Sequence, residues 1–464
     1  MGAQRHRLAV LLFTAALGLQ GCPGAAAADN ALAPPAAEPQ AQPLPEPLAH
    51  PPQQPLPQPE RLQLPQGWLS GQQLLGLPDW LALSLSWTAA PFVNPTGGER
   101  QLGNWMQQSS LSLTMGSGLA KAEREWREVD HWSVAINLNH YSGDPSYASE
   151  IGALFPLQQI AYPSGPLLTE LSLTRSAGGG WLELKGGIVP LNPPFITAPI
   201  FNSYVHSAFN NTLNLSLVNS LTLTPYNLPI NPYAALGGIA TIQPRPNLNL
   251  RYGWFDLRST AGLAGWLGGP ALPPPSALGS AQMLQLDWSP PSLAPASGAT
   301  LPACRRGAAL TRRKPNCPQP VQVDNQLPGG LFSLGGLNGS SEGRGAYGSL
   351  TLRSGLPLGL DDRVWIGGSW GSDGQSSVNV SFLGAGLLIQ GIVPRRPLDL
   401  LVLGAGRAAG LGTGDEGMVE LGYQWQINRN LALQPTLQWI IHPSGASPTP
   451  PGILAAGLQI SLTF

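Results

Sequence analysis

Short runs in which apolar and polar residues alternate recur from Leu81 to the end of the chain, and they constrain the fold more than any other feature. A period of two places successive side chains on opposite faces of an extended strand. The clearest apolar faces are Leu81 to Trp87, Trp132 to Leu138, Leu248 to Trp254, Val419 to Ile427 and Leu437 to Ile441. Helical periodicity is weak throughout, so the sequence predicts an all-β fold.

A soluble sandwich and a membrane barrel would both give this period, and the composition separates them. Only 11% of the residues are charged, against roughly 25% in soluble domains. After the first 22 residues no apolar run reaches the length that a spanning helix needs. The polar faces often carry charges or amides, and the apolar faces often end in Trp or Tyr, which is typical of a barrel with aromatic girdles. We therefore predict a transmembrane antiparallel β-barrel of about 16 strands over residues 67–464.

The residues before the predicted barrel divide into two segments. Residues 1–28 resemble a signal peptide, with Arg5 and Arg7 before a short apolar stretch and an Ala-rich cleavage site. Lipoprotein processing at Cys22 is the alternative, although Gln20 fits that motif poorly. Residues 29–66 are rich in Pro, Ala and Gln and predict a disordered, extended spacer. This spacer is either a passive tether or an arm that contacts peptidoglycan.

The last eight residues, GLQISLTF, form the most specific single signal in the chain. Leu458, Ile460, Leu462 and Phe464 lie on one face of this predicted strand, and Gln459, Ser461 and Thr463 lie on the other. A closing strand that ends in an aromatic residue resembles the terminal strand of bacterial outer-membrane proteins, which the barrel assembly machinery reads. We therefore predict that Phe464 is an assembly signal.

From Gly414 onward the chain resembles the carbohydrate-selective porin family, the OprB-type porins. The matching positions are Glu416, Glu420, Tyr423, Leu431, Leu433, Gln434, Pro435, Leu437, Gln438, Pro443 and Gly445. A second similarity covers Gly391, Arg396, Pro397 and Asp399, and a weaker one runs in order from Trp181 to Asp256. Cyanobacterial members commonly carry a surface-layer-homology domain before the barrel, and here the Pro-rich spacer stands in its place.

The resemblance implies a sixteen-stranded porin, a homotrimer in one reading, that passes sugars or other small polar solutes through the outer-membrane lipid. A sugar pore needs polar side chains that exchange hydrogen bonds with hydroxyl groups. The candidates for the pore lining, chosen by their place in the alternation, are Glu183, Lys185, Arg251, Glu420, Gln424, Gln438 and His442. Each of them has a plainer interpretation as a solvated side chain that plays no part in selection.

Residues 301–326 form a basic insert that contains Cys304 and Cys317. In an oxidising compartment these two thiols are candidates for a disulfide that pins the loop. Such a loop would favour anions if it reached the pore mouth, and otherwise it is a solvated surface loop.

Other classes of function find little support in the sequence. The formal charge of −1 gives no basic footprint for nucleic acid. The six His are scattered without metal-ligand spacing, no nucleophile, zinc-protease or phosphate-loop motif occurs, and we expect neither a cofactor nor an enzyme activity. Two hypotheses remain: a passive porin for small hydrophilic solutes, and a non-conducting barrel that anchors the envelope through its Pro-rich arm.

Overall fold

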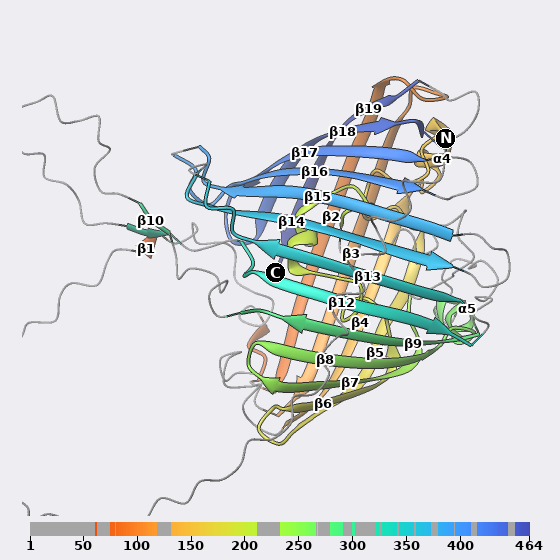
Figure 1. The fold of residues 1–464 in the computed structure, drawn as a ribbon, viewed down its shortest axis with the longest axis vertical. Helices are drawn as coiled ribbons and strands as arrows, with labels where there is room; N and C mark the ends of the chain where they lie inside the picture. The colour runs from red at the N-terminus through yellow and green to blue at the C-terminus, as the bar shows by residue number, and fades with distance from the viewer. Residues whose placement is uncertain are drawn as a thin grey trace, which may run out of the picture. The chain divides into compact units, whose positions relative to one another are not determined.

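Sixteen antiparallel strands close into a barrel in the computed structural model (Figure 1). The structure describes residues 61–62, 75–78, 80–117, 131–210, 233–265, 267, 279–290, 299–301, 321–323, 327–340, 343–356, 359–372, 379–393, 395–409, 415–443 and 451–464. The predicted fold class and strand number are therefore confirmed. In the described part of the chain, no helix is long and apolar enough to cross a membrane.

Each barrel strand pairs with its neighbour along the chain. The strands are β2 (Leu81–Thr96), β3 (Gly103–Gly116), β4 (His131–Gly143), β5 (Gly165–Ala177), β6 (Leu182–Val189), β7 (Ala235–Arg245), β8 (Leu248–Asp256), β9 (Ser280–Trp288), β12 (Leu331–Gly339), β13 (Arg344–Leu352), β14 (Asp361–Ser372), β15 (Asn379–Gln390), β16 (Leu400–Ala409), β17 (Glu416–Gln426), β18 (Leu431–Ile441) and β19 (Ile453–Thr463). Three short helical elements, α4 (Tyr147–Ile151), η1 (Pro199–Ser203) and α5 (Ser259–Gly265), lie in the connections.

A separate three-stranded sheet contains β1 (Arg61–Leu62), β10 (Ala299–Leu301) and β11 (Val321–Val323). β1 belongs to the predicted spacer, and it pairs in parallel with β11 in the basic insert. Cys22, Cys304 and Cys317 lie outside the described residues, so the predicted disulfide and the lipidation alternative stay predictions.

The barrel closes where the first and last strands pair. Thr463 is opposite Ser86, and Leu85 and Phe464 exchange two backbone hydrogen bonds of 3.1 and 2.8 Å. The start of β2 and the end of β19 therefore share one rim, which we call the C-terminal rim. The opposite rim, from which the connections after β4 and β6 depart, we call the loop rim. The connection from β9 to β12, which contains the basic insert, belongs to the C-terminal rim by strand direction.

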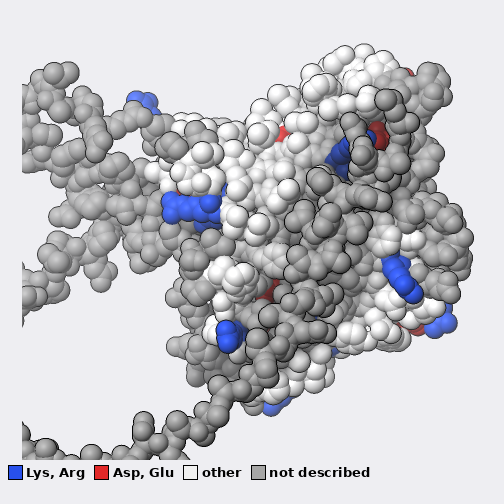
Figure 2. Space-filling model, in the orientation of Figure 1, with Lys and Arg blue, Asp and Glu red and all other residues white. Residues whose placement is uncertain are grey.

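The outer surface between the rims is apolar and is bounded by exposed tryptophans. Toward the loop rim these are Trp105, Trp254, Trp370 and Trp439, and toward the C-terminal rim they are Trp132, Trp181, Trp288 and Trp425. Between them the outward positions carry residues such as Leu284, Ile366 and Leu437, which are about half exposed. On the face drawn in Figure 2, few charged side chains appear on the described surface. Two aromatic girdles around an apolar band are typical of a lipid-facing barrel.

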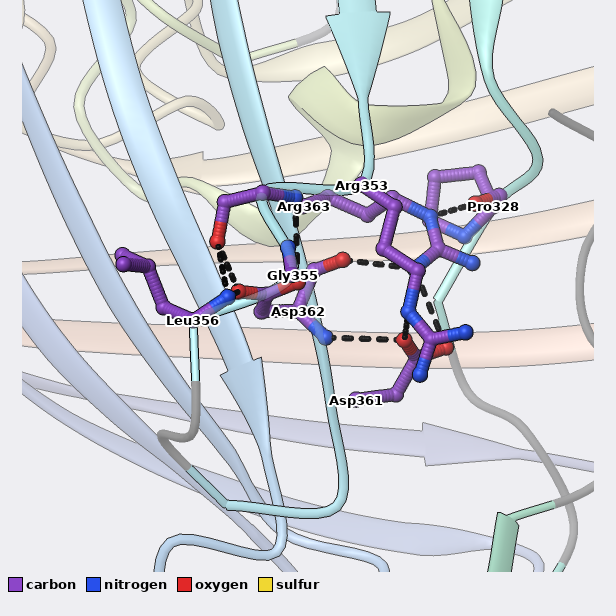
Figure 3. Close-up of polar contacts among 8 residues, drawn as sticks. Pro328, Arg353, Gly355, Leu356, Asp361, Asp362 and Arg363 are labelled. Atoms are coloured by element: carbon purple, nitrogen blue, oxygen red, sulfur yellow. Dashed lines mark hydrogen bonds and ion pairs between the residues drawn. The ribbon is translucent and has the colours of Figure 1, made fainter.

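At the C-terminal rim, a network of charges holds the turn between β13 and β14 (Figure 3). Asp361 accepts from Arg353 Nε at 2.9 Å and from Arg363 Nη1 at 3.0 Å. The Arg363 side chain is 2% exposed, and its Nε donates to the Pro328 carbonyl at 2.6 Å. Because Pro328 lies just before β12, this arginine ties the returning end of the long connection to the barrel wall.

Deletion of Phe464 is expected to impair barrel assembly and to leave export unaffected, because both closing hydrogen bonds between Phe464 and Leu85 are lost with the terminal aromatic. The measurement is the amount of heat-modifiable protein in the outer-membrane fraction. Phe464→Tyr, which keeps the aromatic ring and the backbone bonds, is the matched control. Normal amounts of folded protein after the deletion would contradict this prediction.

Candidate functional site

Two connections from the loop rim fold into the barrel and narrow its interior. The first inward segment, residues 144–164, joins β4 to β5 and contains α4. The second inward segment, residues 190–210, follows β6 and contains η1. The two pack on each other through hydrogen bonds from Gln159 N to Val205 O and from Ser207 N to Pro156 O, at 2.9 and 3.2 Å. Figure 1 shows yellow-green chain among the strands, where the second segment begins.

The second inward segment reaches across the barrel from β9 to β17. At one end, Ile196 N donates to Gln285 Oε1 on β9 at 3.0 Å. At the other end, Val205 N and His206 N donate to the two carboxylate oxygens of Glu420 on β17 at 2.8 and 2.6 Å. Six strands separate β9 from β17 in the barrel order, so the segment runs as a chord through the interior.

β17 and β18 together hold both inward segments. Glu416, one helical-turn distance before Glu420 in sequence but on the same face of a strand, accepts from Leu154 N at 2.9 Å. Gln438 Nε2 donates to Leu157 O and Gln434 Nε2 donates to Ser203 O, both at 2.9 Å. Charged acceptors make hydrogen bonds roughly twice as strong as neutral ones, so the two glutamates are the main anchors of these segments.

Aromatic packing on a glycine-rich stretch of wall completes the attachment. Tyr204 accepts from Trp365 Nε1 at 2.6 Å and donates to Leu403 O at 3.0 Å. Its ring lies over β16, where a Cβ at Gly404 would come within 2.7 Å of Tyr204 Cε1. Phe209 lies beside Gly406 in the same way, at 2.9 Å from a hypothetical Cβ. The glycines therefore provide the space that the two rings fill.

The interior on this side is dry. Burial lowers the pKa of His206 to about 3, so its imidazole is neutral at physiological pH, and its Nδ1 accepts from Ala208 N at 3.0 Å. Burial likewise raises the pKa of the Tyr204 hydroxyl. Trp365, Phe382 and Val402 from the barrel wall join the inward segments in one buried apolar cluster.

Across the lumen, the inward side chains of β3–β8 form a second surface, which we call the polar wall. Its uncharged members include Ser110, Ser112, Asn137, Ser172, Thr174 and Thr241, all placed inward by the strand register. Small hydroxyl and amide groups both donate and accept hydrogen bonds, so a hydrated wall of this kind can exchange water for solute hydroxyl groups.

Charges on and beside the polar wall occur as pairs of opposite sign. Lys185 Nζ lies 2.5 Å from Glu170 Oε1, and that carboxylate also accepts from Asn137 Nδ2 at 2.7 Å. Arg251 on β8 pairs with Asp287 on β9. Lys185 and Arg251 retain 28% and 21% of their side-chain exposure, so both remain in contact with the lumen. Paired charges produce local fields with little net field along the pore.

The predicted pore residues fall into three groups. Glu183, Lys185 and Arg251 lie together on the polar wall, where Glu183 is opposite Thr241 and Thr241 is opposite Arg251. Gln424 points inward near the C-terminal rim, half-buried, and its amide lies 3.4 Å from that of Gln426. His442 follows β18 at the loop rim, exposed and with a φ of 53°.

Glu420 and Gln438 form the third group, and here the prediction was wrong. Both side chains point inward, as their place in the alternation required, yet both are 0% exposed. The inward segments cover them, because the backbone N–H groups of Val205 and His206 and the carbonyl of Leu157 take up their polar atoms. They hold the pore constriction in place and do not line an open lumen.

Several residues of the site were not predicted from the sequence. Glu170 and Asp287 lie in the alternating runs TELSLTR and MLQLDW, so the same period-2 argument would have placed both inside. Glu416 was noted only as part of the family resemblance. The packing of Tyr204 on Gly404 depends on long-range contacts that carry no local signal.

The fold and interior together define a porin-type barrel: sixteen strands, a constriction made by inward connections, and a polar wall beside it. Residues 339–464 match the sequence model of the carbohydrate-selective porin, OprB family, which confirms the predicted resemblance over the part that contains Glu416 to Gly445. The weaker similarity from Trp181 to Asp256 lies outside the matched residues. No curated protein matches the chain.

Solved structures show the same fold. The high-pH structure of OprB from Pseudomonas putida has a TM-score of 0.63 and 15% sequence identity, and the match covers 85% of this chain and 96% of that one. The low-pH structure of the same protein has a TM-score of 0.49 at 13% identity, covering 87% and 100%. A Pseudomonas aeruginosa protein, OccD3 (OpdP), has a TM-score of 0.43 at 11% identity, covering 82% and 91%.

Replacement of Glu420 by Leu is expected to release the second inward segment from the wall. The variant leaves the N–H groups of Val205 and His206 without their acceptor, at a cost of about 1–3 kcal/mol for each group. The segment should then fluctuate, and single-channel recordings should show larger and noisier openings than wild type.

Leu421→Ala is the matched control, since this neighbour on the same strand faces outward and is 43% exposed. Identical conductance and noise for the wild-type and Glu420→Leu proteins would show that Glu420 does not hold the constriction.

Proposed function

We propose that the protein is an outer-membrane porin that lets small hydrophilic solutes diffuse passively, with neutral hydroxylated molecules such as sugars as its preferred class. The observation that carries the proposal is the reversal of polarity across one closed sheet. Between the tryptophan girdles the outward side chains are apolar, whereas inward positions such as Ser112, Asn137 and Thr241 are polar. A sheet with an apolar outside and a wet inside is suited to lipid and not to water.

The preference for sugars has two supports. The matched family is described as carbohydrate-selective porins. Independently, Lys185 and Arg251 are paired with Glu170 and Asp287, so the lumen offers charged hydrogen-bonding groups without a strong net field. A neutral solute with many hydroxyl groups meets partners on the polar wall, and an ion of either sign gains little.

The remaining parts of the proposal concern partners. Outer-membrane lipid surrounds the apolar band, and the barrel assembly machinery recognises the closing strand that ends at Phe464. The Pro-rich segment before β2 leaves from the C-terminal rim, which suits an arm directed toward peptidoglycan. No reaction or cofactor is part of this function.

Conductance across a planar lipid bilayer tests the proposal. We expect open channels whose reversal potential in a KCl gradient stays close to zero, because the lumen charges are paired. A strongly cation-selective reversal potential would contradict the account of the lumen. Folded protein that inserts and never conducts would instead favour the non-conducting anchor, for which the packing of two segments inside the barrel is the supporting observation.

A further inference from the structure

One group of polar side chains faces outward from the barrel inside the apolar band. Gln107 and Ser109 on β3 and His140 and Ser142 on β4 occupy outward positions, alternating with inward residues such as Met106 and Tyr141, which are buried. Gln107 is opposite Ser142, and Ser109 is opposite His140. Directly opposed residues in antiparallel strands have Cβ atoms about 4.5–5.5 Å apart, so the four side chains form one surface, the β3–β4 polar patch.

The patch lies between the two girdles. On β3, Trp105 belongs to the girdle near the loop rim, and Gln107 and Ser109 follow it toward the other rim. On β4, the apolar outward residues Val134, Ile136 and Leu138 separate Trp132 from His140. Ser109 and His140 are exposed side chains at this depth.

Other outward polar residues of the described strands lie level with a girdle tryptophan or beyond it. Arg175 is opposite Trp132, Gln282 is opposite Trp254 and Ser381 is opposite Trp370. Interfacial positions of this kind reach water and headgroups. The β3–β4 polar patch has no such outlet, because lipid chains offer no hydrogen-bond partner.

We propose that the β3–β4 polar patch is a contact surface for a second copy of this chain in the membrane, an inference that rests on the proposed function. Membrane insertion gives every copy the same orientation and depth, so rotation about the membrane normal brings the patch of one copy to the level of the same patch on another. Amide, hydroxyl and imidazole groups each donate and accept hydrogen bonds, so the patch is complementary to itself.

The neighbouring outward residues allow two walls to approach closely. Ala89 on β2 lies opposite Gln107, and Pro166 on β5 lies opposite His140. In membranes, small residues at a contact bring backbones together, and polar side chains form hydrogen bonds across it. Both features occur in this sector of the wall, which therefore fits a protein partner better than lipid chains.

Site-directed cross-linking in native membranes tests the proposal. Ser109→Cys is introduced into the full chain with Cys304 and Cys317 replaced by Ser, and a short thiol-specific cross-linker is added. We expect a band at twice the monomer mass. Ile366→Cys is the matched control, because Ile366 is 53% exposed on the outer face of β14, on the other side of the barrel. No cross-linked band at Ser109→Cys, or equal bands at both positions, would overturn the proposal.

A second measurement separates loss of contact from loss of fold. The triple variant Gln107→Leu, Ser109→Leu, His140→Leu makes the patch apolar, and we expect it to stay heat-modifiable and to shift to monomer in native mass spectrometry from mild detergent. A wild-type protein that is monomeric there, with or without a bound lipid, would contradict the proposal. Conductance of single barrels is independent of this outcome, so failure of the contact leaves the pore intact and detectable.

Discussion

Every backbone N–H and C=O group that faces a lipid bilayer must find a partner within the protein, and the rest of this structure depends on that requirement. A sheet meets it only by closing on itself, which the pairing of β19 with β2 achieves. Closure gives each strand a lipid side and a lumen side, and the period-2 pattern of the sequence follows from this division. The charge deficit has the same origin, since a charged residue on the lipid side would cost roughly 2–4 kcal/mol near the midplane.

A closed barrel of this size would be wide, and the inward segments set what remains open. They enter from the loop rim and are held by carboxylates and amides of β17 and β18, foremost Glu420 and Glu416. Aromatic packing on β14–β16 makes that half of the interior dry, as the buried Tyr204 and Phe209 show. The solute path is therefore displaced toward the polar wall, where Lys185 and Arg251 remain partly exposed in their ion pairs.

The fold could be predicted from the sequence because its main signals are local. Alternation, girdle tryptophans and the terminal GLQISLTF strand are each visible within ten residues or so. The site was predictable only in part. Alternation placed Glu420 and Gln438 on the inner face, but it could not show that segments more than 200 residues away in sequence cover them. The same limit applies to Arg251, whose partner Asp287 lies 36 residues further on, with a loop in between. Inward connections are tertiary features, and strand periodicity carries no information about them.

The central claim is that this protein is a selective diffusion pore whose open path runs along a polar, nearly field-free wall. Liposome swelling with a graded series of neutral sugars, and with charged solutes of the same size, tests it most directly. The account predicts rapid swelling with monosaccharides, a steep decline with increasing sugar length, and no large advantage for anions or cations of equal size. Absence of swelling with any sugar, or equal rates for small and large sugars, would contradict it.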